Sequence, residues 1–299
     1  MRKIPIAIFG NGLVALDLLS KITESPILEC KIVFCRTKKP TFEKLAARHG
    51  VRMEYDLIHG FNKHAGDYEA LFDCTSALAH RKYSPVFKNL DKLIINLTPE
   101  KAGHLCMPAL NMQTLIDNRV KYFDMVSCGG QAGIPIIHAI SEVDKDIEYA
   151  ELFINATSES LGAGSRANID EYIDTTEDGI RFFAKNRTLR AKAIATANNA
   201  KRNMRVTVYA EMSPNKIGEI RVSVDKMVKE VQKYVPGYKL LVEPLVEGDH
   251  IMVSLEIRGI GDFTPEFFGN VDIIARAAIQ AAEKFFIANR NQRPPSSIQ

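Results

Sequence analysis

The sequence predicts an α/β protein, in which a doubly wound parallel sheet is followed by an α+β domain. In the first half of the chain, apolar segments of strand length alternate with amphipathic segments of helical periodicity, as in a parallel sheet with helices on both faces. Beyond Cys128 the strands lengthen and alternate apolar with polar residues, which indicates an antiparallel sheet with helices on one face. Because 299 residues exceed the ~150 of a typical domain, we expect two domains.

Each element follows from its local pattern. Apolar runs predict strands in the first half at 4–10, 28–35, 70–76, 92–99 and before Cys128, with amphipathic segments at 14–22, 42–50 and 81–90. Longer alternating runs predict strands at 149–160, 192–199, 204–212, 238–246 and 250–259, with helices at 166–184, 224–235 and 270–290. Asn270, after Gly269, is the expected N-cap of the last helix. The domains are therefore 1–127 and 128–268, followed at 269–299 by a helix and a polar, disordered tail.

Composition and charge exclude several classes of protein. The 39 Lys and Arg residues against 36 Asp and Glu residues leave a net charge of +3, spread along the chain, which argues against nucleic-acid binding. No run approaches the ~18 apolar residues of a membrane span, and the N-terminal run indicates a buried strand rather than a targeting segment. Five scattered cysteines without a C-x-x-C pair indicate neither disulfides nor a metal site, as expected in the cytoplasm.

A glycine-rich turn separates the first strand from the first helix. It has the pattern G-x-G-x-x-A and consists of Gly10, Asn11, Gly12, Leu13, Val14 and Ala15. In a Rossmann domain such glycines permit a tight turn and a close approach of the backbone to a pyrophosphate at the helix N-terminus. We therefore expect residues 1–127 to bind a dinucleotide, the alternative being an ordinary strand-to-helix turn.

The second strand ends on basic residues. An acidic residue usually stands there and binds the adenosine ribose of NAD, whereas this chain has Arg36 with Lys38 and Lys39 close behind. Arginine suits the additional phosphate of NADP. We expect NADP to be preferred over NAD, unless these residues are solvated loop charges.

Cys128 lies in YFDMVSCGGQAGIPIIHAI, which predicts a strand, a sharp glycine turn and a helix. The thiol would precede a helix N-terminus, where the partial positive charge lowers its pKa and free N–H groups stabilise an oxyanion. From this stretch alone, Cys128 is either a nucleophile or an apolar thiol buried in a βα turn.

Six blocks extend the argument over nearly the whole chain. They are FDCTSALAH (72–80), INLTPEKAGHLCMPALN (95–111), VSCGGQAGIP (126–135), SESLGAGSRANIDEY (158–172), VQKYVPGYKL (231–240) and GNVDIIARAA (269–278). In these blocks and their order, the sequence resembles the acylating acetaldehyde dehydrogenase family, whose members interconvert an aldehyde and its acyl-coenzyme A thioester with a nicotinamide cofactor.

The resemblance implies a Rossmann domain plus an α+β catalytic and dimerisation domain like that of glyceraldehyde-3-phosphate dehydrogenase, with the final helix returning to the first domain. It implies that Cys128 forms the acyl thioester, that Asn168 polarises the substrate carbonyl and that Asn270 approaches the nicotinamide. A second cofactor-contacting stretch would comprise Ser160, Leu161, Gly162, Ala163, Gly164, Ser165, Arg166 and Ala167. It also implies NADP or NAD as cofactor, coenzyme A as substrate, a homodimer or larger oligomer, and a 4-hydroxy-2-oxoacid aldolase as partner.

The sequence departs from the resemblance at Val206. Family members typically read M-R-D-T-V-Y where this chain reads MRVTVY, so the aspartate that assists proton transfer at the thiol is missing. The chain has lost catalysis, recruits another base, or favours a reaction that needs less help. Reduction of an acyl thioester is such a reaction, because one thiolate displaces another of similar basicity. The valine would also add apolar surface to the acyl pocket and admit a larger or aromatic group.

Other candidates are weighed against structural roles. The substitute bases considered are His80, His104 and His138, for each of which a structural role is favoured. Asp170 and Glu171 are expected as helix N-terminal charges, and Cys74 and Cys106 as core thiols. Two further functions stay open: a semialdehyde or acyl-phosphate reductase of the same architecture, and a non-catalytic cofactor-binding subunit of an aldolase complex.

Overall fold

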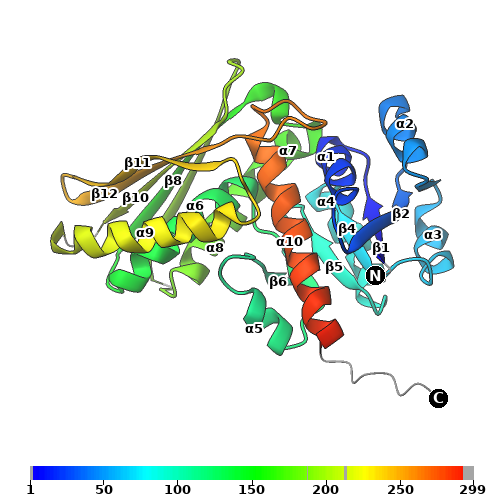
Figure 1. Ribbon diagram of the computed structural model, residues 1–299, viewed down its shortest axis with the longest axis horizontal. Helices are drawn as coiled ribbons and strands as arrows, with labels where there is room; N and C mark the ends of the chain where they lie inside the picture. Colours follow the sequence, from blue (N-terminus) through cyan, green and yellow to red (C-terminus); the bar gives the residue numbers. More distant parts are fainter. Residues whose placement is uncertain (1–2, 187, 212–213, 292–299) are drawn as a thin grey trace.

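The protein is built on two sheets that lie side by side (Figure 1). The computed structural model describes residues 3–186, 188–211 and 214–291. The first sheet has the strand order β3-β2-β1-β4-β5-β7-β6, and every neighbouring pair is parallel. Its strands are β1 (Ile4–Phe9), β2 (Leu28–Phe34), β3 (Arg52–Glu54), β4 (Ala70–Asp73), β5 (Leu93–Asn96), β6 (His104–Leu105) and β7 (Tyr122–Asp124).

Helices cover both faces of this sheet, as the alternating pattern predicts. They are α1 (Leu13–Ile22), α2 (Pro40–Arg48), α3 (Leu57–Lys63), α4 (Ala77–Lys88) and α5 (Met112–Asp117). In β1, Ile6 and Ile8 belong to the core cluster on the α1 side, whereas Ala7 and Phe9 belong to the cluster under α3 and α4. The edge strands β3 and β6 were not predicted, because they are only 3 and 2 residues long and contain exposed residues.

The second sheet has the order β11-β12-β10-β8-β9. Its strands are β8 (Tyr149–Thr157), β9 (Arg190–Asn198), β10 (Met204–Glu211), β11 (Tyr238–Glu247) and β12 (His250–Ile257). The expected antiparallel sheet is only partly correct, since β8 and β9 pair in parallel. Between them the chain forms helices and returns by a crossover connection, which joins parallel rather than antiparallel strands. Residue 212, the expected end of β10, lies outside the described residues.

Three helices cover one face of the second sheet (Figure 1). They are α6 (Cys128–Val143), α8 (Ile169–Phe183) and α9 (Ile217–Gln232). The short η1 (Ser158–Ser160) and α7 (Ala163–Ala167) precede α8, and η2 (Pro214–Lys216) precedes α9. Helix α6 approaches the sheet so closely that a Cβ on Gly129 would lie 2.4 Å from Ile154 Cδ1. The glycines after Cys128 therefore permit close packing inside the helix and do not form the sharp turn that the sequence suggested.

The last helix, α10 (Gly269–Asn291), packs against α1 and α6 (Figure 1). A buried ion cluster joins α10 to α1: Lys21 Nζ lies 2.7 Å from Asp17 Oδ1 and 3.1 Å from Asp272 Oδ1. Asn270 lies inside the helix, so its prediction as N-cap is wrong; Gly269 begins the helix against β12, where a Cβ would lie 1.9 Å from Ile257 O. Residues 292–299 of the expected tail lie outside the described residues.

Candidate active site

A cleft of about 610 Å³ brings together residues from both halves of the chain. It opens at the carboxyl ends of β1, β2 and β4, where the strand order reverses and ligands of doubly wound sheets bind. The predicted site residues that line it are Gly10, Asn11, Gly12, Leu13, Val14, Arg36, Cys128, Ser160, Gly162, Gly164, Ser165, Ala167, Asn168 and Asn270. Leu161 and Arg166 are not among the lining residues; the Arg166 guanidinium instead donates to Ser158 O at 2.9 Å and holds that loop. Of Ala163 only the backbone is described.

The glycine turn presents the N-terminus of α1 to the cleft. Gly10 has φ +112°, and a Cβ there would lie 3.0 Å from Cys74 O, so the position requires glycine. A Cβ on Gly12 would meet no atom within 4 Å and would occupy open space at the cleft. No side chain caps α1, and the first N–H groups of a helix have no partner within it. This cradle fits a pyrophosphate.

Positive charge lies at the end of the cleft next to β2. Arg36 is exposed and lines the cleft beside Lys39, whose Nζ donates to Asn11 O at 3.0 Å. Lys38 lies away from the cleft with its Nζ 5.7 Å from the centre of the Tyr55 ring. Among the described residues that line the cleft, none is Asp or Glu. The charge distribution therefore suits an anionic ligand.

Cys128 is the first residue of α6. Ser127 caps the helix by accepting a hydrogen bond from Gly130 N at 2.9 Å, and the turn is made by Val126, which has φ +50°. A β-branched residue rarely adopts this left-handed conformation, and such strain collects at functional sites. The partly exposed Cys128 side chain is thereby held at the cleft.

The Cys128 thiol has a partner that the sequence reasoning missed. Tyr172 Oη of α8 lies 3.4 Å from Cys128 Sγ and accepts a hydrogen bond from Gly129 N at 3.0 Å. Burial raises the pKa of the Cys128 thiol above its ordinary value, and the bonds from Tyr172 and the helix N–H groups only partly offset this. The expectation of a lowered pKa is therefore wrong. No sequence spacing relates Tyr172 to Cys128.

Two asparagines complete the wall of the cleft. Asn168 donates through Nδ2 to Gly164 O, and because an amide nitrogen carries two protons, one is left for a ligand. Asn270 donates weakly to Ser160 O at 3.4 Å, while its buried Oδ1 has no partner. A buried acceptor without a partner costs free energy, and the amide of a nicotinamide is a donor that would satisfy it.

Of the other candidate residues, only Cys74 is among those that line the cleft. His80 is fully buried, and its Nδ1 lies 2.7 Å from Asp73 Oδ2. His104 is exposed on β6, and His138 Nδ1 lies 2.8 Å from Phe183 O. Asp170 and Glu171 lie in the first turn of α8, as expected. Cys106 is a buried thiol as predicted, but Cys74 is partly exposed and lines the cleft.

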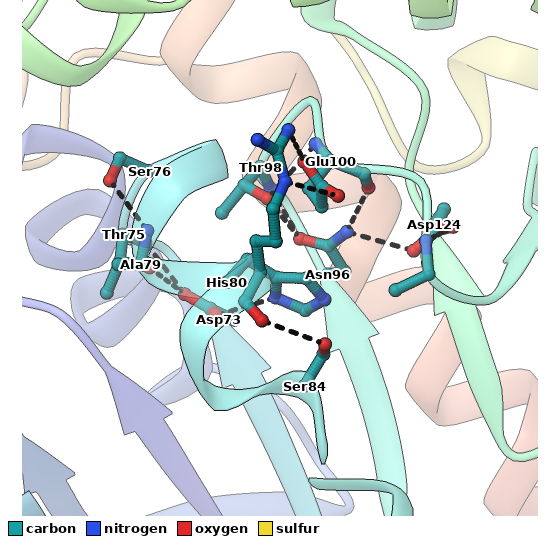
Figure 2. A network of polar contacts seen from close by, with 12 residues as sticks. Asp73, Thr75, Ser76, Ala79, His80, Ser84, Asn96, Thr98, Glu100 and Asp124 are labelled. Carbon is teal, nitrogen blue, oxygen red and sulfur yellow. Dashed lines mark hydrogen bonds and ion pairs between the residues drawn. The ribbon is translucent and has the colours of Figure 1, made fainter. Parts of the chain in front are cut away.

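Below the cleft, a polar network holds the loops that follow β4 and β5 (Figure 2). Asp73 accepts from Thr75 N at 2.8 Å, and Asn96 accepts from Thr98 N at 2.9 Å. Asn96 Nδ2 donates to Asp124 Oδ1 of β7 at 2.9 Å, which ties neighbouring strand ends together. Thr75 and Thr98 both line the cleft, so this network positions its floor.

Val206 does not lie at the cleft. It is fully buried on β10, and it is not among the residues that line the cleft. The expectation that it shapes an acyl pocket is therefore wrong.

Comparison with known proteins identifies the family. A family model described as prokaryotic acetaldehyde dehydrogenase, dimerisation, matches residues 128–265. An acetaldehyde dehydrogenase of Pectobacterium atrosepticum is 37% identical over 284 residues, covering 94% of this chain and 95% of the relative. The chain belongs to the acetaldehyde dehydrogenase family. A Geobacillus stearothermophilus member is also 37% identical, over 95% of this chain and 96% of its own.

Solved structures confirm the fold class predicted for this family member. Aspartate semialdehyde dehydrogenase II of Vibrio cholerae superposes with a TM-score of 0.69 over 98% of this chain and all of its own, at 12% identity. The Candida albicans aspartate semialdehyde dehydrogenase, solved with NADP, gives 0.70 at 11% identity, over 96% of this chain and 99% of its own. Family membership makes the chain an oxidoreductase of the aldehyde dehydrogenase class. None of the helices in the described ranges has the length and apolar character of a membrane span.

Proposed function

We propose that the protein interconverts an aldehyde and its acyl-coenzyme A thioester with a nicotinamide cofactor, through an acyl thioester on Cys128. The observation that carries the proposal is one cleft into which both the α6 N-terminus, with Cys128, and the glycine turn of α1 open. A nucleophile and a dinucleotide cradle in one cleft are what such a reaction needs.

The chain's own residues supply the acyl transfer. The Cys128 thiolate attacks the thioester carbonyl, a new S–C bond forms, and the coenzyme A thiolate leaves. The free amide proton of Asn168 would stabilise the oxyanion, because the Gly129 and Gly130 N–H groups already donate to Tyr172 Oη and Ser127 Oγ. The bound nicotinamide would supply or accept the hydride. Gly10 to Val14 would hold its pyrophosphate, and Asn270 its carboxamide.

We infer that reduction of the acyl thioester is the favoured direction, with NADPH as donor. Aldehyde oxidation needs a base to remove the hemithioacetal proton, and a missing base costs ~10²–10⁴ in rate. No Asp, Glu or His is found among the described residues that line the cleft. Acyl transfer between thiolates needs little base assistance, and Arg36 supports NADPH.

The proposal extends to partners. The match to a dimerisation family model supports a homodimer, and the resemblance of the sequence supports an aldolase that supplies or takes the aldehyde. Five free thiols support a cytoplasmic location.

The first experiment follows the absorbance of NADPH or NADH with a panel of acyl-coenzyme A thioesters. Turnover that is lost in Cys128→Ala but kept in Cys74→Ala, the other partly exposed thiol of the cleft, is the expected result. Turnover with acyl phosphates instead would make the protein a reductase of that class. A protein that binds the cofactor but shows neither turnover nor acylation of Cys128 would favour a non-catalytic subunit.

A further inference from the structure

Tyr172 places a single hydroxyl against the proposed nucleophile. Its Oη lies 3.4 Å from Cys128 Sγ and 3.0 Å from Gly129 N. The Gly129 N–H donates to the phenol oxygen, so this bond leaves the phenol proton free. That proton can therefore point to the sulfur.

A chain of hydrogen bonds fixes Tyr172 relative to the start of α6. Thr176 Oγ1 donates to Tyr172 O at 2.6 Å and lies 2.6 Å from Ser127 Oγ. Because the Thr176 proton is engaged with the carbonyl, Ser127 must donate to Thr176, while it accepts from Gly130 N at 2.9 Å. These hydrogen bonds, together with one between the Ser127 hydroxyl and the Tyr172 phenol, hold α8 against the N-terminus of α6.

The phenol remains protonated at neutral pH. Burial and the neighbouring Cys128 raise the pKa of Tyr172 well above its usual value. The other titratable groups that line the cleft are Cys35, Arg36, Lys39 and Cys74, on the loops after β2 and β4. Tyr172 is thus the titratable side chain whose hydrogen bond to the Cys128 thiol lowers that thiol's pKa.

We propose that Tyr172 is a catalytic residue, which donates its phenol proton in a hydrogen bond to the Cys128 sulfur and so stabilises the thiolate when it forms. It keeps that proton throughout, and the thiol proton leaves to solvent. Tyr172 thereby stabilises the Cys128 thiolate both when it attacks and when it is later expelled. The described lining of the cleft lacks a carboxylate or imidazole base. The inference rests on the proposed role of Cys128 as nucleophile.

The test measures the rate of Cys128 alkylation by iodoacetamide against pH, resolved by peptide mass, with neither substrate nor cofactor. Tyr172→Phe keeps the ring and removes the donor. A hydrogen bond to a charged group contributes about one to two pKa units. In Tyr172→Phe we therefore expect the midpoint of the alkylation rate against pH to rise by this amount. The alkylation rate at neutral pH should fall about 10- to 100-fold. Tyr234→Phe is the control, because its buried hydroxyl has no hydrogen-bond partner.

An unchanged pH profile in a folded Tyr172→Phe protein would overturn the proposal. Should that variant not fold, global replacement of tyrosine by 3-fluorotyrosine keeps every side chain in place and makes the phenol a stronger donor. The Cys128 midpoint should then fall, and an unmoved midpoint would also overturn the proposal. Because the assay requires no turnover, its outcome is separate from that of the acyl-thioester experiment.

Discussion

Gly133 of α6 lies directly against Val206 of β10, so that a Cβ on the glycine would come within 3.1 Å of Val206 Cγ1. The position where the family resemblance expects an aspartate therefore belongs to the apolar layer between helix and sheet. Leu152 closes the same layer, 2.4 Å from that Cβ. A valine suits this layer, and a carboxylate at this position would be buried.

Restoring the aspartate should destabilise the protein rather than supply a base. Val206→Asp buries a charge without a partner, which costs about 3–5 kcal/mol in free energy of unfolding, whereas the neutral Val206→Asn lacks that charge. Burial raises the pKa of the new carboxyl, so the difference between the variants should be largest above it and shrink as the pH falls. Urea unfolding at several pH values measures this. A Val206→Asp protein of wild-type stability that gains aldehyde oxidation would refute the prediction.

Alkaline pH should weaken the fold. Burial raises the pKa of the Cys30 thiol to about 12, whereas an unfolded thiol titrates near ~8.5. The folded state therefore keeps a proton that the unfolded state loses. The stability from this group is complete below about pH 8.5 and is lost towards about pH 12, at ~1.4 kcal/mol per pH unit. In urea unfolding, the free energy of unfolding of Cys30→Ala should fall with rising pH less steeply than that of the wild type, by this amount. An equal fall in both proteins would contradict the raised pKa of Cys30.

Arg36 should set the cofactor preference. Arg36→Ala removes a charged donor to the extra phosphate, so kcat/KM for NADPH should fall about 10- to 100-fold while that for NADH changes less than about threefold. Lys38→Ala is the matched control, because its ammonium lies over the Tyr55 ring. Equal losses with both cofactors, or equal efficiencies in the wild type, would argue against NADP preference.

Substitution of Gly10 should affect the stability of the protein, whereas substitution of Gly12 should affect cofactor binding. Gly10→Ala forces a side chain into φ +112° against Cys74 O and should lower the free energy of unfolding by about 1–3 kcal/mol. Gly12→Ala meets no neighbour and should leave stability within about 0.5 kcal/mol. Its methyl group would keep a phosphate from the backbone, so cofactor binding should weaken about tenfold or more. Thermal unfolding and cofactor titration of both variants test the contrast, which a normal affinity in Gly12→Ala would contradict.

The sequence alone was sufficient to predict the fold class, most of the strands and the place of Cys128 at the start of a helix. Periodicity is a local property, and it already separates Ile6 and Ile8 from Ala7 and Phe9 on opposite faces of β1. The glycine turn could be predicted for the same reason, since the backbone conformation of Gly10 is set within one strand-to-helix connection. The edge strands β3 and β6 were missed because strands of two or three residues are too short to show an alternating pattern.

Contacts between distant elements were decided by the tertiary structure. Tyr172 meets the Cys128 sulfur across 44 residues of sequence, and Val206 is buried between β10 and α6. The docking of α8 and β10 against α6 sets both positions. The raised pKa of Cys128 is likewise a consequence of burial, which outweighs the helix N-terminus. A sequence pattern specifies which face of a helix or strand is apolar. How those faces pack decides which side chain meets the Cys128 sulfur. Desolvation and hydrogen bonding act over only a few ångströms in space, so they follow the packing.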